Sequence, residues 1–205
     1  MPKVVDQEER REEIVRAVMN VIERDGLAQV TLANVAAEAG LAIGSVRHYT
    51  GTYRDLLTIT MRAVADSISR RLLDRAAPYR DPDPQVRDLA RRREATEEIL
   101  AELLPLDARR RTETVVWFAF SEAARTDPEL AREAEQHAAG TRGLIGQVLG
   151  AAARSAGAHW DVEVETYRLA ALLDGLAFSA VQRPQDADLA LTVLRRHLTS
   201  LLPTP

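Results

Sequence analysis

The sequence contains no cysteine among its 205 residues. Disulfide bonds, thiolate nucleophiles and cysteine-ligated zinc sites are therefore excluded, and the composition is compatible with a reducing compartment. No apolar run approaches about 18 residues, so we expect no segment that spans a membrane. The amino-terminal stretch MPKVVDQEERREE is charged and has no apolar centre, so we do not interpret it as a signal peptide, and we expect a cytoplasmic protein.

Metal-binding patterns and aromatic residues are also scarce. The four histidines show no metal-ligand spacing, because Glu133 and His137 are four residues apart rather than three, as a di-iron bundle requires. We interpret His137, His159 and His197 as surface residues and predict neither a metal nor a cofactor. The nine aromatic residues leave room for a cage around a quaternary ammonium group, but no pattern indicates one.

The chain is rich in hydrophobic residues, which make up 46% of it and are enough for one large domain or two small ones. Apolar residues recur at helical intervals, as in Ile14, Val18 and Ile22, and the alternation typical of strands is missing. Asp83 and Pro84 have the pattern of a helix start. We predict an all-α fold of about nine helices, over residues 8–25, 32–39, 42–49, 53–76, 84–104, 108–126, 128–156, 161–182 and 186–201.

The two short helices near the amino terminus have the spacing of a helix-turn-helix. Thr31 is placed to cap the first of them, and Ala36 is small where the second helix must cross closely. Gly40 follows four residues later, where the chain needs a positive φ, and Val46 is the apolar residue that packs back. An ordinary corner between two helices would share these features, so the pattern alone leaves both interpretations open.

The stretch GLAIGSVRHYTG, residues 40–51, favours the DNA-binding interpretation. The net charge of −4 argues against a protein that coats nucleic acid without specificity, but residues 40–54 carry Arg47 and Arg54 and no acidic residue. The outward face of the second helix would present residues suited to a major groove. These are Ile43, Ser45, Arg47 and His48.

Residues 30–57, VTLANVAAEAGLAIGSVRHYTGTYRDLL, resemble the TetR family of transcriptional regulators. The resemblance implies a three-helix DNA-binding domain over residues 1–54 and a helical ligand-binding and dimerisation domain over residues 55–205. The carboxy-terminal part is similar to the effector domain of betaine-pathway-type repressors, through LLPLDARRRTETVVWFAFSEAARTDPELA and LLDGLAF. By this resemblance, Thr31, Ser45, Arg47, Tyr49 and Tyr53 would contact phosphates, with Arg54 adjacent, and Ile43, Ser45 and His48 would lie nearest the bases.

Three residues depart from the family pattern. Arg47 stands where the family has tyrosine, Thr50 where it has phenylalanine, and Tyr53 where it has lysine. Arg47 keeps a residue type that binds phosphate. Thr50 is expected to weaken the small core beneath the second helix, and Tyr53 replaces a cation by a hydroxyl donor. Thr50 and Tyr53 support an alternative in which the fold serves as a protein-interaction module that has lost DNA binding.

The carboxy-terminal helices are the candidates for dimerisation and for effector binding. The helices within residues 161–201 are apolar enough to need a partner, which is either the core of the same chain or a second copy. We predict a homodimer through them, which would match a palindromic operator. Trp117 and Phe120 share one helical face and are candidate ligand contacts, although core packing would also explain them.

Polar residues of the same region have two interpretations. Asp174 lies in an apolar helix, where a buried carboxyl needs a partner, so it would order the dimer interface or contact a cationic ligand; nearby Phe178 is a further candidate ligand contact. We interpret the arginine runs 91–93 and 109–111 as solvated faces.

Taken together, these patterns predict a ligand-responsive transcriptional regulator that binds double-stranded operator DNA as a homodimer. We expect it to be a repressor that a small-molecule effector releases from the DNA. A helical-bundle enzyme is the third interpretation. It is disfavoured because the sequence shows no nucleophile and base pair, metal spacing or phosphate-binding loop.

Overall fold

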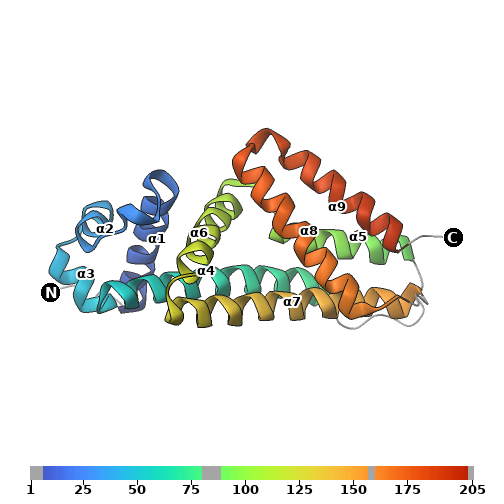
Figure 1. Ribbon diagram of the computed structural model, residues 1–205, viewed down its shortest axis with the longest axis horizontal. Coiled ribbons are helices and arrows are strands. Elements are labelled where there is room, and N and C mark those ends of the chain that lie inside the picture. Colours follow the sequence, from blue (N-terminus) through green and yellow to red (C-terminus); the bar gives the residue numbers. More distant parts are fainter. Residues whose placement is uncertain (1–6, 80–88, 157–159, 203–205) are drawn as a thin grey trace. The chain divides into compact units, whose positions relative to one another are not determined.

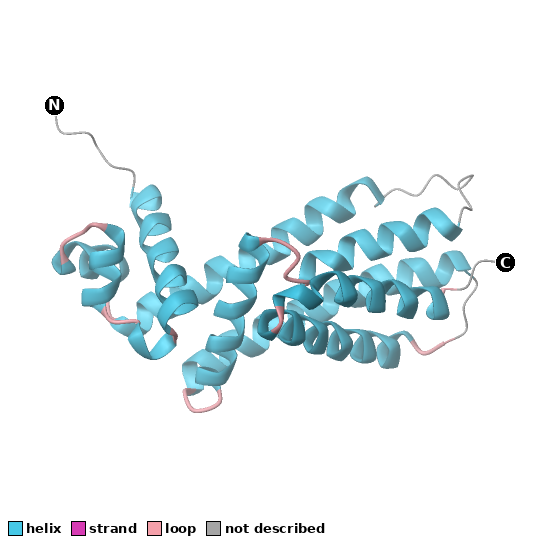
Figure 2. Cartoon of the chain, turned by 90° about the horizontal axis from the view of Figure 1, so that it is seen from above, coloured by secondary structure: helices cyan, strands magenta, loops and turns pink. Residues whose placement is uncertain are grey.

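A computed structural model describes residues 7–79, 89–156 and 160–202. All regular structure in these ranges is helical (Figures 1 and 2), which confirms the predicted all-α fold. The nine α-helices of the described ranges are α1 (Gln7–Asp25), α2 (Leu32–Ala39), α3 (Ile43–Thr50), α4 (Tyr53–Ala76), α5 (Leu89–Leu100), α6 (Ala108–Ala124), α7 (Pro128–Ala156), α8 (Val162–Gln182) and α9 (Ala187–Leu201).

Most helix ends lie within two residues of their predicted positions. Helix α5 differs, because it ends at Leu100 and a short 3-10 turn, η3 (Ala101–Leu103), occupies the rest of the predicted span. Two further 3-10 turns, η2 (Ala77–Tyr79) and η4 (Pro184–Asp186), follow α4 and precede α9. The predicted helix start at Asp83 and Pro84 lies outside the described residues.

The chain divides into two compact units. The first contains residues 1–66 and 115–135, and the second contains residues 67–114 and 136–205. Helices α4, α6 and α7 each contribute residues to both units. The boundary at residue 54 that the family resemblance implies is a functional one, and it remains a prediction.

The core of the first unit is built where α1, α2 and α3 pack on one another. Each helix supplies apolar residues at helical spacing, so each presents one buried stripe. A fully buried side chain of this size stabilises the fold by about 1.5–3 kcal/mol relative to its exposure. Apolar residues of the unit with no solvent exposure are Ile14, Val18, Val35, Val46, Leu56, Met61, Val116 and Phe120.

The second unit has its own core, in which α9 packs against both α5 and α8. Helix α8 begins at a polar cap, because Asp161 Oδ1 accepts hydrogen bonds from Glu163 N at 2.9 Å and Val164 N at 3.2 Å. The cap satisfies two amides that the start of α8 would otherwise leave without partners. The least exposed core residues of the unit are Leu100, Leu104, Ile145, Leu149, Leu169, Leu194 and Leu198.

Candidate nucleic-acid interface

Helix α2 begins with the predicted threonine cap. Thr31 has an extended backbone conformation, and its Oγ1 accepts a hydrogen bond from Asn34 N at 3.0 Å. The cap satisfies one amide that a helix start leaves without a partner, which contributes about 1 kcal/mol. Because Oγ1 acts there as an acceptor, its hydroxyl proton can still be donated to a phosphate oxygen.

The turn between α2 and α3 depends on Gly40, which has φ 65° and ψ 32°. Leu41 N donates to Ala36 O at 2.8 Å and Gly40 N donates to Ala37 O at 3.3 Å, so the last carbonyls of α2 are satisfied by a Schellman motif. The predicted positive φ at Gly40 is confirmed. This turn sets the angle at which α3 leaves α2.

Helix α3 is held to the core by Val46 and Thr50, which are both buried. Thr50 Oγ1 donates to Val46 O at 2.8 Å, so its hydroxyl is satisfied within the helix. The expectation that Thr50 weakens the small core stays a prediction. The side chain is shorter than phenylalanine, but it leaves no polar group without a partner.

The outward face of α3 presents the residues predicted to approach bases. Ile43 is 52% exposed, and Arg47 and His48 are exposed beside it, whereas Ser45 and Tyr49 are half-buried. In the described ranges no ion pair involves Arg47, so its charge is not neutralised by a carboxylate of the same chain. An uncompensated cation on an acid-free helix suits a phosphate or a guanine edge.

Arg11 of α1 was not singled out from the sequence, yet it lies at this surface. Its Nε donates to Tyr49 O near the end of α3, at 3.2 Å. A cation at the carboxy-terminal end of a helix is favoured by the helix dipole. The pairing depends on residues 38 positions apart, which explains why no local sequence signal indicated it.

Helix α4 begins with a capping box next to α3. Asp55 Oδ2 accepts from Thr52 N at 2.8 Å and from Thr52 Oγ1 at 2.7 Å. These hydrogen bonds, led by the one from the backbone of Thr52, lower the pKa of Asp55. Tyr53 follows the cap and is exposed, and partial burial raises the pKa of its phenol. Tyr53 therefore presents a neutral hydroxyl donor at the position expected to contact a phosphate.

Arg54 has partners of another kind. Its guanidinium lies 3.2 Å from an Asp127 oxygen and 3.0 Å from a Glu129 oxygen, both near the start of α7. The two carboxylates raise the pKa of Arg54. Arg54 thus differs from Arg47, since its charge is balanced by acids of the same unit.

The residues predicted to contact a ligand belong to different units. Phe120 is in the core of the first unit and Trp117 is half-buried one turn earlier on α6, whereas Asp174 and Phe178 are exposed on α8 in the second unit. The expectation that Asp174 is buried is wrong for the single chain, although partial burial raises the pKa of its carboxyl against the opposing effect of Arg142. The four residues remain predictions as ligand contacts.

A cavity of about 600 Å³ lies elsewhere in the second unit. It is lined by residues of α4, η2, α5 and α7, and none of the four predicted contacts lines it. Arg91 and Arg92 line it, and Arg91 is exposed whereas Arg92 and Arg93 are half-buried, so the interpretation of residues 91–93 as a solvated face holds only in part. The run 109–111 is mixed in the same way, because the side chain of Arg109 is 66% exposed, whereas that of Arg110 is only 17% exposed and pairs with Asp107 and Glu102.

Two histidines differ from their expected surface positions. His137 and His197 are half-buried, and His159 lies outside the described residues. The described parts of the chain contain no group of three or more His, Cys, Asp or Glu arranged to hold a metal ion. Across the same parts, no helix is both long and apolar enough to cross a membrane.

A capped helix, a glycine turn and a second helix with an exposed basic face define a helix-turn-helix regulator. Residues 92–203 match the family described as "BetI-type transcriptional repressor, C-terminal". The chain is 34% identical over 204 residues to the HTH-type transcriptional regulator PksA of Bacillus subtilis (strain 168), covering 98% of this chain and 94% of that one. The chain therefore belongs to the TetR family of transcriptional regulators, with a carboxy-terminal domain of BetI type.

Solved structures show the same fold. A transcriptional regulator from Rhodococcus sp. Rha1 superimposes with a TM-score of 0.77 at 25% identity, over 94% of this chain and 95% of that one. A transcriptional regulator from Saccharomonospora viridis, in complex with choline, gives a TM-score of 0.77 at 19% identity with the same coverage.

Proposed function

We propose that this chain represses transcription as a homodimer in the cytoplasm, where α3 of each copy enters the major groove of a palindromic operator. A small molecule bound by the carboxy-terminal domain releases the DNA. The observation that carries the proposal is the exposed face of α3, where Arg47 has no acidic partner among the described residues and Ile43 and His48 stand beside it. Regulators of this family bind operator DNA and effectors, typically as dimers.

The exposed face of α8 supports the homodimer. Its outward residues Val164, Tyr167, Ala171, Asp174 and Phe178 follow one another at intervals of three and four, which is the spacing of a helix-packing seam. Tyr167 is 71% exposed and Phe178 is 53% exposed in the single chain. A stripe of large exposed apolar side chains is stabilised when another surface buries it. A second copy of the chain, related by a two-fold axis, presents the same stripe and can bury it.

A two-fold dimer matches the operator geometry. The two recognition helices would reach half-sites about 34 Å apart, or a multiple of that distance. A ligand shifts an equilibrium between two states only if it binds one of them more tightly. The effector would therefore bind more tightly to the dimer state in which the distance between the two recognition helices does not match the half-sites. The regulator from S. viridis, whose fold this chain shares, was solved in complex with choline. That complex supports the binding of a small-molecule effector by this fold.

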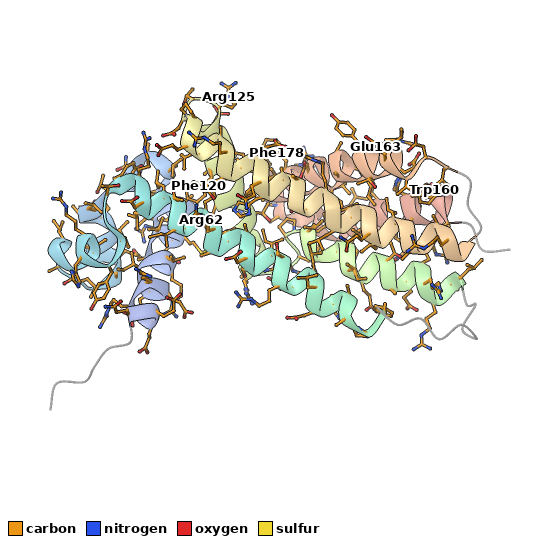
Figure 3. All side chains as sticks on the ribbon, turned by 90° about the horizontal axis from the view of Figure 1, so that it is seen from below. Arg62, Phe120, Arg125, Trp160, Glu163 and Phe178 are labelled. Carbon is orange, nitrogen blue, oxygen red and sulfur yellow. The ribbon has the colours of Figure 1, made fainter. Side chains whose placement is uncertain are left out.

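The DNA contacts are tested by the double variant Arg47→Ala with Tyr49→Phe. It removes the cation and the phenol hydroxyl but keeps the ring of Tyr49 packed. We expect operator binding to be lost while the unfolding temperature and the dimer mass stay unchanged. Arg125→Ala is the matched control, because Arg125 is an exposed arginine at the end of α6 (Figure 3) and is 70% exposed. Unchanged affinity in the double variant would contradict the placement of the DNA-binding face.

The interface is tested by Phe178→Asp, measured as mass by light scattering after size exclusion. We expect a monomer, because two buried aspartates would face each other without partners. The control is Leu73→Asp, which places the same charge on an exposed apolar position of α4. A dimer of unchanged mass in Phe178→Asp would place the interface on another surface.

A further inference from the structure

The cavity of the second unit has a polar end and an apolar end. Arg91 and Arg92 lie on the first turn of α5, whereas Ile99 and Leu100 lie at its last turn. Ile99 follows Arg92 by seven positions, which correspond to about 10 Å along a helix. Ala95 and Thr96 stand between them and are buried, so one face of α5 changes from cationic to apolar along the cavity wall.

The opposite walls are apolar except for Gln147 of α7. Helix α4 contributes Leu72, Leu73 and Ala76, and α7 contributes a stripe of residues that includes Leu144, Ile145 and Val148. Leu73 and Tyr79 are each 40% exposed although they line the cavity. Exposed large apolar side chains at a cavity gain from being covered by an apolar ligand. The volume of about 600 Å³ is within the range of small-molecule sites.

The described lining of the cavity carries charged side chains of one kind. Among the described lining residues, the charged ones are Arg91 and Arg92, and neither aspartate nor glutamate occurs. Tyr79 is the one aromatic residue of that described lining, and its hydroxyl donates to Glu98 at 3.4 Å. A quaternary ammonium group is recognised by several aromatic faces, so this lining is unsuited to it. Guanidinium groups bind carboxylates through charge-assisted hydrogen bonds.

We propose that this cavity binds an amphipathic organic anion, with an apolar body about 10 Å long seated against α4, α5 and α7 and a carboxylate at Arg91 and Arg92. The role of this anion as the effector rests on the proposed function, whereas its binding does not. The inferred ligand class differs from choline, which the fold neighbour from S. viridis holds.

The binding test uses the purified full-length chain without DNA. Three probes with the same chain length are titrated by calorimetry below their micellar concentrations: decanoate, 1-decanol and decyltrimethylammonium. We expect decanoate to bind more tightly than decanol and decyltrimethylammonium not to bind. Equal or tighter binding of the cation would overturn the anion specificity, and failure of all three to bind would overturn the cavity as an amphiphile site.

The role of the arginines is tested with Arg91→Gln and Arg92→Gln. Each should weaken decanoate binding about tenfold, equivalent to 1.4 kcal/mol, and leave decanol binding unchanged. Arg93→Gln is the matched control, because Arg93 is the next residue of α5 but does not line the cavity. Val148→Phe, which adds bulk inside the cavity, should weaken both probes. Equal losses in Arg92→Gln and Arg93→Gln would contradict a specific carboxylate contact.

The effector role is measured separately, as loss of the DNA complex on addition of decanoate. We expect decanoate to release operator DNA at the concentrations at which it binds the free protein. Binding by calorimetry that leaves the complex intact would overturn the effector assignment. If the protein bound no operator at all, the proposed function would fail, but the calorimetric result would remain.

Discussion

Arg47 of α3 and Arg71 of α4 differ in what balances their charge. Arg47 is exposed and has no ion-pair partner in the described parts of the chain. Arg71, in contrast, contacts Glu113 and Glu102, and Glu113 also accepts from Ser67 Oγ at 2.7 Å and from Arg109 Nε at 3.2 Å. The ion pairs of Arg71 stabilise the fold, whereas the charge of Arg47 is available for a phosphate or a base. The comparison of these two arginines distinguishes a structural cation from a candidate DNA-binding cation.

The largest effect is expected from removing Glu113, the least exposed acid of the ion-pair cluster that it forms with Arg71 and Glu102. Glu113→Ala should lower the free energy of unfolding by about 3–5 kcal/mol, because it leaves Arg71 with a nearly buried charge and fewer partners. The side chains of Glu113 and Arg71 are only 4% and 17% exposed. Urea unfolding measures the loss.

The control is Glu97→Ala, which removes the partner of Arg195, a side chain that is 57% exposed. We expect a far smaller loss there, because exposed ion pairs are screened by solvent. Equal losses in the two variants would remove the distinction between the buried cluster and a surface pair.

The opposite behaviour is expected at α3. Arg47→Ala should cost about 1–3 kcal/mol of operator-binding free energy, and leave the free energy of unfolding within about 0.5 kcal/mol of the wild type. Fluorescence anisotropy with operator DNA and urea unfolding measure the two quantities. A large loss of stability with unchanged binding would make Arg47 a structural arginine like Arg71.

A substitution in the turn before α3 should have a smaller, destabilising effect. Gly40→Ala should destabilise the chain by about 1 kcal/mol, because alanine is strained at a left-handed backbone position. No neighbouring atom would meet the new Cβ, so the cost comes from the backbone alone. Gly44→Ala, inside α3 and also free of contacts, should raise stability through helix propensity. Thermal unfolding that moves both variants in the same direction would contradict this account.

The smallest effect concerns pH and the second unit. Burial lowers the pKa of His197 below its usual 6.5, Arg168 lowers it further, and Glu165 opposes the shift. The unfolded chain therefore takes up this proton first, and the stability that neutral His197 contributes is lost as pH falls below 6.5 toward the folded-state pKa. His197→Gln should lose less stability than the wild type between pH 7.5 and 5.5, as measured by urea unfolding. An identical pH dependence in the two proteins would exclude His197 as the cause.

The helix-turn-helix could be predicted from the sequence because its determinants are local. The Thr31 cap, the Gly40 turn and the buried Val46 all act within a few residues of their own helices. The cavity could not be predicted, since it forms where α4, α5 and α7 meet and its lining spans residues 72–152. The arginine runs show the same limit, because no local pattern distinguishes Arg92 at a cavity from Arg110 in an ion-pair cluster.

The aromatic residues of α6 show the same limit of prediction from local sequence. The spacing of Trp117 and Phe120 correctly places them on one helical face, but it leaves open whether that face meets a ligand or the core. The structure buries Phe120 completely in the first unit. Whether an apolar helix face meets the core or a ligand cavity depends on the other helices that pack against it, and the sequence of that one helix does not determine it.

The central claim is that α3 binds a specific DNA sequence. The most direct measurement is fluorescence anisotropy of the purified protein with the DNA upstream of its own gene, across a salt series, against a scrambled duplex of the same length. The account predicts tighter binding to a palindrome within the upstream DNA, with an affinity that falls steeply as salt rises because phosphate contacts release counterions. Weak binding that is equal for the upstream and scrambled duplexes and insensitive to salt would contradict it, and would favour a protein-interaction module on the same fold.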